Sequence, residues 1–349
     1  MRLTGIDCQI PSRQIFNEDI VELVKCYSEA HYNHKLTELE TLIKKFLCRT
    51  GIESRFWRAK KEKPIDLIKT SVDNSLKMAN IDTRDIDLVI YSSIDRGFIE
   101  PANASFICKA LGLNNVRSFD IVDACMGWAT AVQVANSLLE SSSSINSVLI
   151  INAEFPMDNK GSVLPDNFTI CDNKELRWKS ASFTLGEAAS ACVFQKDTSA
   201  NCKFEFIENP QNADLCKISL ENFEKYIAGP QEKCSFPNLN FFANSSSLLQ
   251  NGMDPAISVL RTLMDKLNYN PKIIFPHSVS VKIIKDASMS AGVQSLIYST
   301  FSKLGNLATA SVPGSIKQAL SEKLIQKNER AIAWIASAGM KFSAFEIQL

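Results

Sequence analysis

The chain has 349 residues, of which 45% are hydrophobic and 22% are charged, so it is long enough to bury one large core or two ordinary ones. Its 38 basic and 38 acidic residues cancel, which argues against nucleic acid or an anionic membrane as a bulk partner. No apolar run reaches the roughly 20 residues of a membrane span, and the N-terminus lacks the apolar centre of a signal peptide. We therefore expect a cytoplasmic protein, and its cysteines, with no Cys-x-x-Cys pair, to be reduced.

The first long periodic segment runs from Asp19 to Leu47 and predicts one long helix that contains His31 and His34. Two imidazoles three residues apart on a helix can share a metal ion. Because acidic or thiol ligands at a fitting spacing are missing nearby, we interpret the pair as part of a polar helix face and assign it no chemistry. We expect no bound metal.

Two segments far apart in the chain repeat one pattern of helix, polar turn and apolar strand. In the first half, Pro64 to Ala79 has apolar residues at helical spacing and leads into the apolar run from Ile86 to Ser93. In the second half, Met253 to Leu267 leads into the run from Lys272 to Ser278. Each half therefore predicts a helix followed by a buried strand.

The match continues with a helix that begins with small residues, from Cys125 to Leu139 in one half and from Thr309 to Leu320 in the other. Apolar strands then close both halves, at residues 147–153 and 330–336. This order predicts two related α/β units, 1–198 and 199–349, with mixed sheets packed through shared helices. Chance similarity of two α/β halves is the alternative.

The segments between the repeats lack a clean period. Residues 154–180 and 204–250 are predicted to be rich in loops, and within the second segment the run 238–249 shows neither helical nor strand spacing.

Cys125 stands where the strand-like run that begins at Ser118 turns into the helical run that ends near Asn136. At the start of a helix, unpaired N–H groups and the macrodipole favour a thiolate over a thiol, and this is how a cysteine becomes a nucleophile. A buried and inert cysteine is the ordinary alternative in a chain with ten cysteines. Only the position of Cys125 argues for chemistry.

At this point the residues match a known family. The chain resembles, over essentially its full length, the ketoacyl synthase III branch of the thiolase superfamily. The motifs that carry the resemblance, in chain order, are Arg49-Thr-Gly-Ile52, Asp123-Ala-Cys125-Met-Gly127, Leu185-Gly186-Glu-Ala-Ala189, Pro276-His277-Ser278 and Gly305-Asn306-Leu-Ala-Thr-Ala-Ser-Val-Pro313. The resemblance implies a duplicated, five-layered αβαβα fold with mixed sheets, a homodimer, and a Cys-His-Asn active site at the end of a tunnel for a phosphopantetheine arm.

Carried over position by position, the resemblance makes Cys125 the nucleophile that takes an acyl group from a thioester. It places His277 and Asn306 where the family keeps the two side chains that donate hydrogen bonds to a thioester oxygen as an enolate develops. The alternatives are a hydrogen-bonded core imidazole for His277 and an ordinary turn for Asn306, which follows Gly305.

A second oxyanion site is implied for the tetrahedral adduct on Cys125. Its donors would be the backbone N–H of Cys125 and one N–H from the loop Ser337-Ala338-Gly339. Ala338 departs from the family pattern, because glycine is usual at its position. A backbone donor survives that change.

Glu100 is a more informative departure, because fatty-acid-initiating members carry an aromatic residue at its position. Members that condense two acyl-CoA molecules, the OleA-like branch of long-chain olefin biosynthesis, carry a glutamate there. The resemblance thus implies that Glu100 is a base for the α-proton of the second acyl chain, delivered across the dimer interface, with a pKa raised by an apolar pocket. A surface glutamate ahead of a proline turn is the alternative.

Arg49 matches a position near the tunnel mouth where a guanidinium can meet a phosphate of the substrate's carrier. Lys45 stands where an aromatic residue often stacks on adenine, which leaves room for either an acyl-CoA or an acyl carrier protein as the donor. No nucleotide-binding glycine motif is present, and we expect no cofactor beyond the CoA or phosphopantetheine of the substrates.

Three functions follow from these residues. The first is an acyltransferase that catalyses Claisen condensation through an acyl-Cys125 intermediate, in fatty-acid-like or secondary-metabolite biosynthesis. The second keeps Cys125 and His277 but transfers the acyl group to an alcohol or an amine. The third is a catalytically silent subunit of a heterodimer, against which the retention of Cys125, His277 and Asn306 argues.

Overall fold

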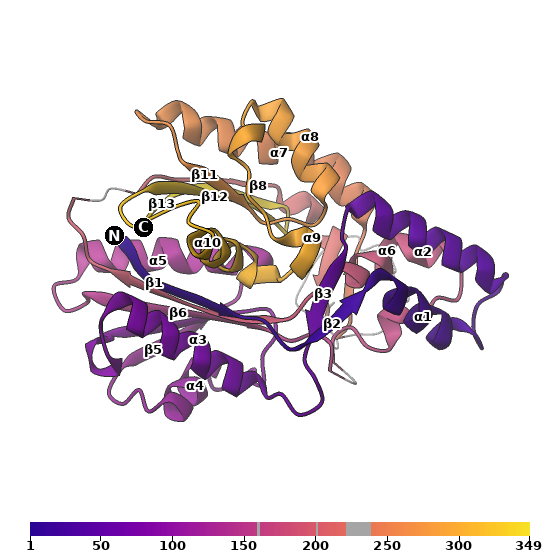
Figure 1. Ribbon diagram of the computed structural model, residues 1–349, viewed down its shortest axis with the longest axis horizontal. Coiled ribbons are helices and arrows are strands. Elements are labelled where there is room, and N and C mark those ends of the chain that lie inside the picture. The colour runs from indigo at the N-terminus through magenta and orange to yellow at the C-terminus, as the bar shows by residue number, and fades with distance from the viewer. Residues whose placement is uncertain (159–160, 200–201, 221–238) are drawn as a thin grey trace.

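The computed structural model describes residues 1–158, 161–199, 202–220 and 239–349, and two stacked sheets form its centre (Figure 1). The first sheet has the strand order β1-β7-β6-β4-β5 and the second the order β11-β12-β13-β8. Their strands are β1 (Arg2–Gln9), β4 (Leu88–Ser92), β5 (Arg117–Ile121), β6 (Ser147–Glu154), β7 (Ala188–Gln195), β8 (Phe204–Glu208), β11 (Ile273–Pro276), β12 (Arg330–Ser337) and β13 (Lys341–Gln348).

The two sheets repeat one arrangement of four strands. In the first sheet, β4 pairs with β6 in parallel, and β6-β7 and β7-β1 are antiparallel. In the second, β11 pairs with β12 in parallel, and β12-β13 and β13-β8 are antiparallel. The predicted internal repeat and its mixed sheets are therefore confirmed.

Helices form three layers around these sheets, which gives the predicted five-layered fold (Figure 1). The helices α5 and α10 lie between the sheets, and their apolar residues share one core with both. One outer pair, α3 and α4, covers the far face of the first sheet, and the other pair, α7 and α8, covers the second. Their bounds are α3 (Pro64–Ala79), α4 (Asn103–Leu111), α5 (Gly127–Ser141), α7 (Ser245–Lys266), α8 (Val281–Ala291) and α10 (Ser311–Ser321).

A further group of elements lies beside the sandwich, at the end where α9 (Phe301–Leu304) is found (Figure 1). It has its own apolar cluster, formed with residues between 157 and 185. The group consists of β2 (Arg13–Phe16), α1 (Asn17–Ser28), α2 (Leu36–Thr50), β3 (Ser54–Trp57) and α6 (Leu176–Lys179), and a separate small ribbon pairs β9 (Cys216–Ile218) with β10 (Phe241–Ala243). Among the described residues, no helix is both long and apolar enough to cross a membrane.

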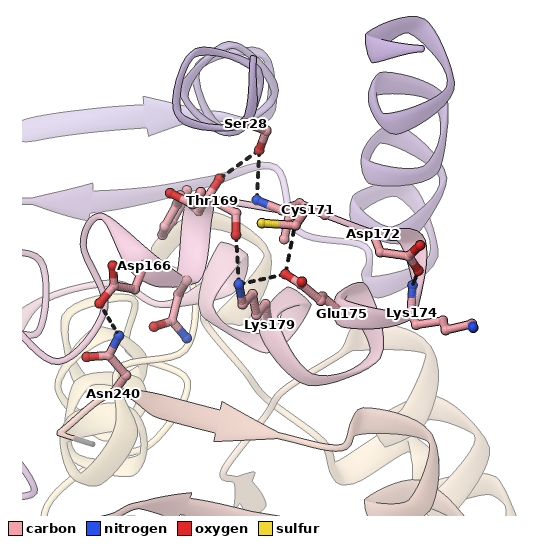
Figure 2. A network of polar contacts seen from close by, with 12 residues as sticks. Ser28, Asp166, Thr169, Cys171, Asp172, Lys174, Glu175, Lys179 and Asn240 are labelled. Atoms are coloured by element: carbon pink, nitrogen blue, oxygen red, sulfur yellow. Dashed lines mark hydrogen bonds and ion pairs between the residues drawn. The ribbon is translucent and has the colours of Figure 1, made fainter. Parts of the chain in front are cut away.

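A polar network orders the loop-rich segment that follows β6 (Figure 2). Ser28 of α1 accepts a hydrogen bond from the Ile170 N–H at 2.9 Å. Lys179 donates to the Thr169 carbonyl at 2.7 Å and to Glu175 at 2.8 Å. These contacts satisfy polar groups that would otherwise be buried without partners, so the segment needs little regular secondary structure.

The prediction of one helix from Asp19 to Leu47 is wrong. The chain forms two helices, α1 and α2, and His31 and His34 lie in the turn between them. A tertiary contact makes the break, because the Asn33 N–H donates to the Cys171 carbonyl at 3.0 Å instead of to its own helix. His34 faces Asp172 at 3.6 Å, an exposed ion pair that forms only when the imidazole is protonated.

Residues 221–238 of the predicted loop-rich segment 204–250 lie outside the described residues. For the rest of the run 238–249, the prediction of a loop is wrong in part. These residues contain β10, and α7 begins at Ser245, ahead of the predicted start at Met253. The side chain of Asn244 accepts a hydrogen bond from the Ser247 N–H at 3.2 Å and caps the helix. Pro255 lies inside α7.

Candidate active site

Cys125 lies in a short 3-10 turn, Ala124–Met126, between β5 and α5. Ala124 has a φ of 45°, a left-handed conformation that costs a non-glycine residue energy and makes the turn sharp. Gly127 lets α5 approach β4, because a β-carbon there would lie 2.6 Å from the Ser92 Oγ. Cys125 as a residue is only partly exposed to solvent, so the turn presents it at a protected site.

The prediction that the helix start favours the thiolate is wrong for the free protein. Burial is the largest cause that raises the pKa of Cys125, and Cys216 and Glu154 raise it further. The backbone N–H of Cys125 acts in the opposite direction but is outweighed. Cys125 is therefore a neutral thiol at neutral pH.

His277 follows β11 directly, and its backbone N–H donates to the Trp334 carbonyl of β12 at 2.8 Å. The side chain is 5% exposed, and burial lowers its pKa to about 4. The imidazole is therefore neutral at neutral pH, with one N–H to donate. Within the described part of the chain, its Nδ1 has no hydrogen-bond partner.

Both backbone polar groups of Asn306 make hydrogen bonds. Its N–H donates to the Thr184 carbonyl at 2.8 Å, and its carbonyl accepts from the Gly186 N–H at 2.9 Å. The side-chain Oδ1 accepts from the Ala308 N–H at 2.9 Å. With its Oδ1 engaged, the side chain of Asn306 keeps its Nδ2 as a hydrogen-bond donor.

Replacing Gly305 by alanine should destabilise the fold by about 3 kcal/mol. A β-carbon there would lie 2.6 Å from the Thr184 carbonyl oxygen, at a φ of 76° and a ψ of −167°, a region that only glycine enters readily. Gly112→Ala is the matched control, since its φ is 68° but its β-carbon would meet nothing within 4 Å. Urea unfolding should show a loss near 1 kcal/mol for the control. Equal losses in the two variants would contradict the crowding at Gly305.

The structure brings the three predicted segments together. Thr309, three residues after Asn306, lies against the Cys125 turn, with its methyl group 3.4 Å from where a β-carbon of Gly127 would be. Ser337, at the end of β12, accepts a hydrogen bond from the Met126 N–H at 2.9 Å. Because β12 also holds His277 through Trp334, this strand is the common support of the nucleophile turn and the histidine.

Ala338 and Gly339 form, with Met340, the hairpin turn between β12 and β13. Gly339 and Met340 have φ values of 77° and 53°. The loop predicted to supply the second oxyanion donor is therefore a tight turn beside the Cys125 turn.

Sequence reasoning missed two carboxyl groups behind this site. Glu154, at the end of β6, accepts hydrogen bonds from the Ile94 N–H at 3.1 Å, from the Asp95 N–H at 3.3 Å and from the Thr309 hydroxyl. Burial raises the pKa of Glu154, and burial and the charge of Glu154 raise the pKa of Asp95 well above its usual range. The charge of one carboxyl group therefore disfavours ionisation of the other. A glutamate that ends an almost wholly apolar strand was the signal in the sequence.

Glu100 and Arg49 are both exposed to solvent. Glu100 is in the loop between β4 and α4, and Arg49 is in the last turn of α2. The end of α2 packs on the start of α8. Gly51 directly follows α2, and a β-carbon there would lie 2.8 Å from Val281, the first residue of α8. Arg49 is thus near the segment that follows His277, and within a single chain Glu100 stays on the surface.

Glu187 should make stability depend on pH. It is 1% exposed, accepts hydrogen bonds from the backbone N–H groups of Arg58 at 2.5 Å and Met157 at 3.0 Å, and burial raises its pKa to about 7. The folded state binds the proton of the Glu187 carboxyl group more tightly than the unfolded state does. The resulting contribution to the free energy of unfolding is fully present below about pH 4.5 and is lost as pH rises through 7.

The variant Glu187→Gln isolates this effect from the other buried titratable groups. The melting temperature of the variant minus that of the wild type should increase from pH 5 to pH 8. The increase should correspond to a change of up to about 3 kcal/mol in the difference between their free energies of unfolding. A difference that does not change with pH would show that Glu187 ionises normally.

Comparisons with known proteins agree with this architecture. Residues 119–210, about a quarter of the chain, match the model of the family 3-oxoacyl-[acyl-carrier-protein] synthase III. A 3-oxopimeloyl-[acyl-carrier-protein] synthase of Brucella abortus is 23% identical, with 100% of this chain and 98% of the relative aligned.

Two solved structures share the fold over the whole chain. OleA of Xanthomonas campestris with bound lauric acid and lauroyl-CoA has a TM-score of 0.81 at 18% identity, covering 100% of this chain and 98% of that one. The 3-oxoacyl-[acyl-carrier-protein] synthase III of Aquifex aeolicus has a TM-score of 0.79 at 18% identity, covering 100% and 99%. The thiolase fold predicted from the motifs is confirmed.

Proposed function

We propose that this chain, whose predicted resemblance to the ketoacyl synthase III family is confirmed by the comparisons, is an acyltransferase that catalyses the Claisen condensation of acyl thioesters. The observation that supports the proposal is that the segment after Asn306 and the strand that holds His277 both contact the turn of Cys125.

The first step is the acylation of Cys125. Its Sγ attacks the thioester carbonyl carbon, the bond from that carbon to the carrier sulfur breaks, and the thiol proton leaves on the carrier as a free thiol. Because Cys125 is neutral before the reaction, attack and proton transfer must be coupled. The negative charge that develops on the carbonyl oxygen is stabilised by hydrogen bonds from the backbone N–H of Cys125 and from one backbone N–H of the 337–339 turn.

The second step forms the carbon–carbon bond. A second thioester becomes a carbanion by losing an α-proton to a base or, from a malonyl thioester, by losing CO₂. Its α-carbon attacks the acyl-Cys125 carbonyl, the bond from that carbon to Sγ breaks, and the products are a β-keto thioester and a Cys125 thiolate that takes up a proton from the base or from water. His277 and Asn306 donate to the oxygen of the second thioester as the enolate develops, and donors of this kind contribute about 3 to 4 kcal/mol each. A neutral imidazole suits this role, and burial keeps His277 neutral down to about pH 4.

A homodimer completes the site in this proposal. The strand β5 ends the first sheet, and among the described strands it pairs with β4 alone. Edge strands are normally covered. Beside it lie exposed apolar residues, including Ile99, which is 79% exposed, and Val122, which is 64% exposed. A second copy that covers this face would bury them and bring Glu100 to the partner's site.

The substrates follow from the relatives and from the surface. Relatives are named for acyl carrier protein, and the OleA structure holds lauroyl-CoA, so the donor here is an acyl-CoA or an acyl carrier protein. Arg49 would meet a phosphate of that carrier. We place the reaction in fatty-acid-like or secondary-metabolite biosynthesis in the cytoplasm.

Product analysis tests this proposal. The purified protein is incubated with lauroyl-CoA, alone and with malonyl-CoA, and the products are identified by mass spectrometry. A β-keto product supports condensation. An ester or amide formed when an alcohol or amine is added would assign the chain to the second class of acyl transfer, and the absence of any acyl transfer would indicate a silent subunit.

A further inference from the structure

We propose that Lys341 is a positioning residue, whose ion pair with Asp123 holds the 338–340 hairpin turn against the Cys125 turn and so fixes the backbone N–H groups that stabilise the oxyanion. This inference rests on the proposed function and assigns a task within it. Lys341 is the first residue of β13, and Asp123 lies two residues before the nucleophile.

The ion pair joins two distant parts of the chain with good geometry. The Lys341 Nζ lies 2.7 Å from the Asp123 Oδ1, and the other oxygen of Asp123 accepts a hydrogen bond from the Thr130 hydroxyl of α5 at 2.7 Å. Glu208 is a more distant partner, at 3.7 Å. Asp123 is thus fixed from two sides, and Lys341 is directed to it.

Lys341 also covers the hairpin turn itself. Its aliphatic carbons lie 3.7 to 3.9 Å from where a β-carbon of Gly339 would be, so the side chain folds back over the turn before it reaches Asp123. Both turns have left-handed residues, Ala124 on one side and Gly339 and Met340 on the other. Strained turns persist only where their surroundings hold them.

A second hydrogen bond joins the hairpin turn to the Cys125 turn. The Ser337 Oγ accepts from the Met126 N–H at 2.9 Å, so the hairpin and the nucleophile turn are joined on both sides of Cys125, through Asp123 and through Met126. This arrangement leaves the two turns little freedom to slide. Small displacements of donor groups strongly reduce the rate of acyl transfer.

The contribution of Lys341 is geometric and not electrostatic. The groups that shift the pKa of Cys125 are Cys216, Glu154 and its own backbone N–H, together with burial. The ammonium group of Lys341 is not among them, so its removal should leave the ionisation of the thiol unchanged. Alkylation by iodoacetamide forms no oxyanion and should be equally insensitive.

The test compares these two reactions of one thiol in the variant Lys341→Met, which keeps the aliphatic cover of Gly339 and removes the ammonium. Acylation of Cys125 by lauroyl-CoA should slow about tenfold, whereas the rate of alkylation by iodoacetamide and its pH profile should match the wild type. Both are followed by mass spectrometry of the peptide that contains Cys125. Lys341→Arg should restore acylation.

The matched control is Lys266→Met. It removes an ion pair of similar length, 2.6 Å from Lys266 to Glu205 on the neighbouring strand β8. Its Cys125 should be acylated at the wild-type rate. Asp123→Asn should slow acylation as Lys341→Met does, and the double variant should be no slower than either. If Lys341→Met is acylated at the wild-type rate, or if its alkylation slows as much as its acylation, the inference about Lys341 is overturned and the proposed function is not affected. Failure of the wild type to take any acyl group would overturn the proposed function and this inference together.

Discussion

Replacing Cys125 by alanine should abolish both acylation and condensation, with a loss of at least about 10⁴-fold in the rate of product formation. Without the sulfur, the acyl group has no covalent carrier, and the reaction cannot be divided into two easier steps. The rate is measured as the release of free CoA from lauroyl-CoA, in the presence and absence of a second thioester.

The control for this variant is Cys26→Ser, because Cys26 is an exposed thiol on α1, away from the site. It should retain full activity. The melting temperature of Cys125→Ala should stay close to that of the wild type, since the change removes a single atom from a residue that is not fully buried. Condensation by a correctly folded Cys125→Ala protein would exclude Cys125 as the nucleophile.

Replacing Glu100 by glutamine should separate two forms of the second step. With a simple acyl-CoA as the second substrate, a base must remove the α-proton, and its loss should lower the rate by about 10² to 10⁴-fold. With malonyl-CoA, loss of CO₂ generates the carbanion, so the rate should hardly change. Full activity of Glu100→Gln with an unactivated acyl partner would refute the base assignment.

Mixed dimers show whether Glu100 acts across the subunit interface. Within one chain Glu100 lies on an exposed loop, so we expect it to serve the Cys125 of a second copy. Refolding Cys125→Ala together with Glu100→Gln should then recover about a quarter of the wild-type activity, because half of the dimers are mixed and each has one complete site. If Glu100 acts within its own chain, no activity should return.

Much of the fold could be predicted from the sequence because local pattern and tertiary context agree. The helix α3 has the predicted bounds, since Pro64 favours a helix start and Asn80 adopts the left-handed conformation that ends one. The strand β6 is buried along its whole length and has a continuous apolar run at residues 148–151. The division of the chain at residue 198 stays a prediction.

The errors arose where distant contacts decide the local structure. The break between α1 and α2 depends on the hydrogen bond from Asn33 to Cys171, and local periodicity contains no sign of it. The charge state of Cys125 was predicted from the helix start alone, whereas burial, Cys216 and Glu154 determine its pKa. Both errors show that a neighbour distant in sequence can outweigh the local preference.

The central claim is that Cys125 carries the acyl group, and the mass of its peptide after incubation with lauroyl-CoA tests this claim most directly. We predict an increase that corresponds to one lauroyl group on the peptide containing Cys125, removed by hydroxylamine, with the peptides of Cys26 and Cys48 unmodified. An unmodified Cys125 peptide, or a lauroyl group spread over the exposed cysteines, would contradict the account.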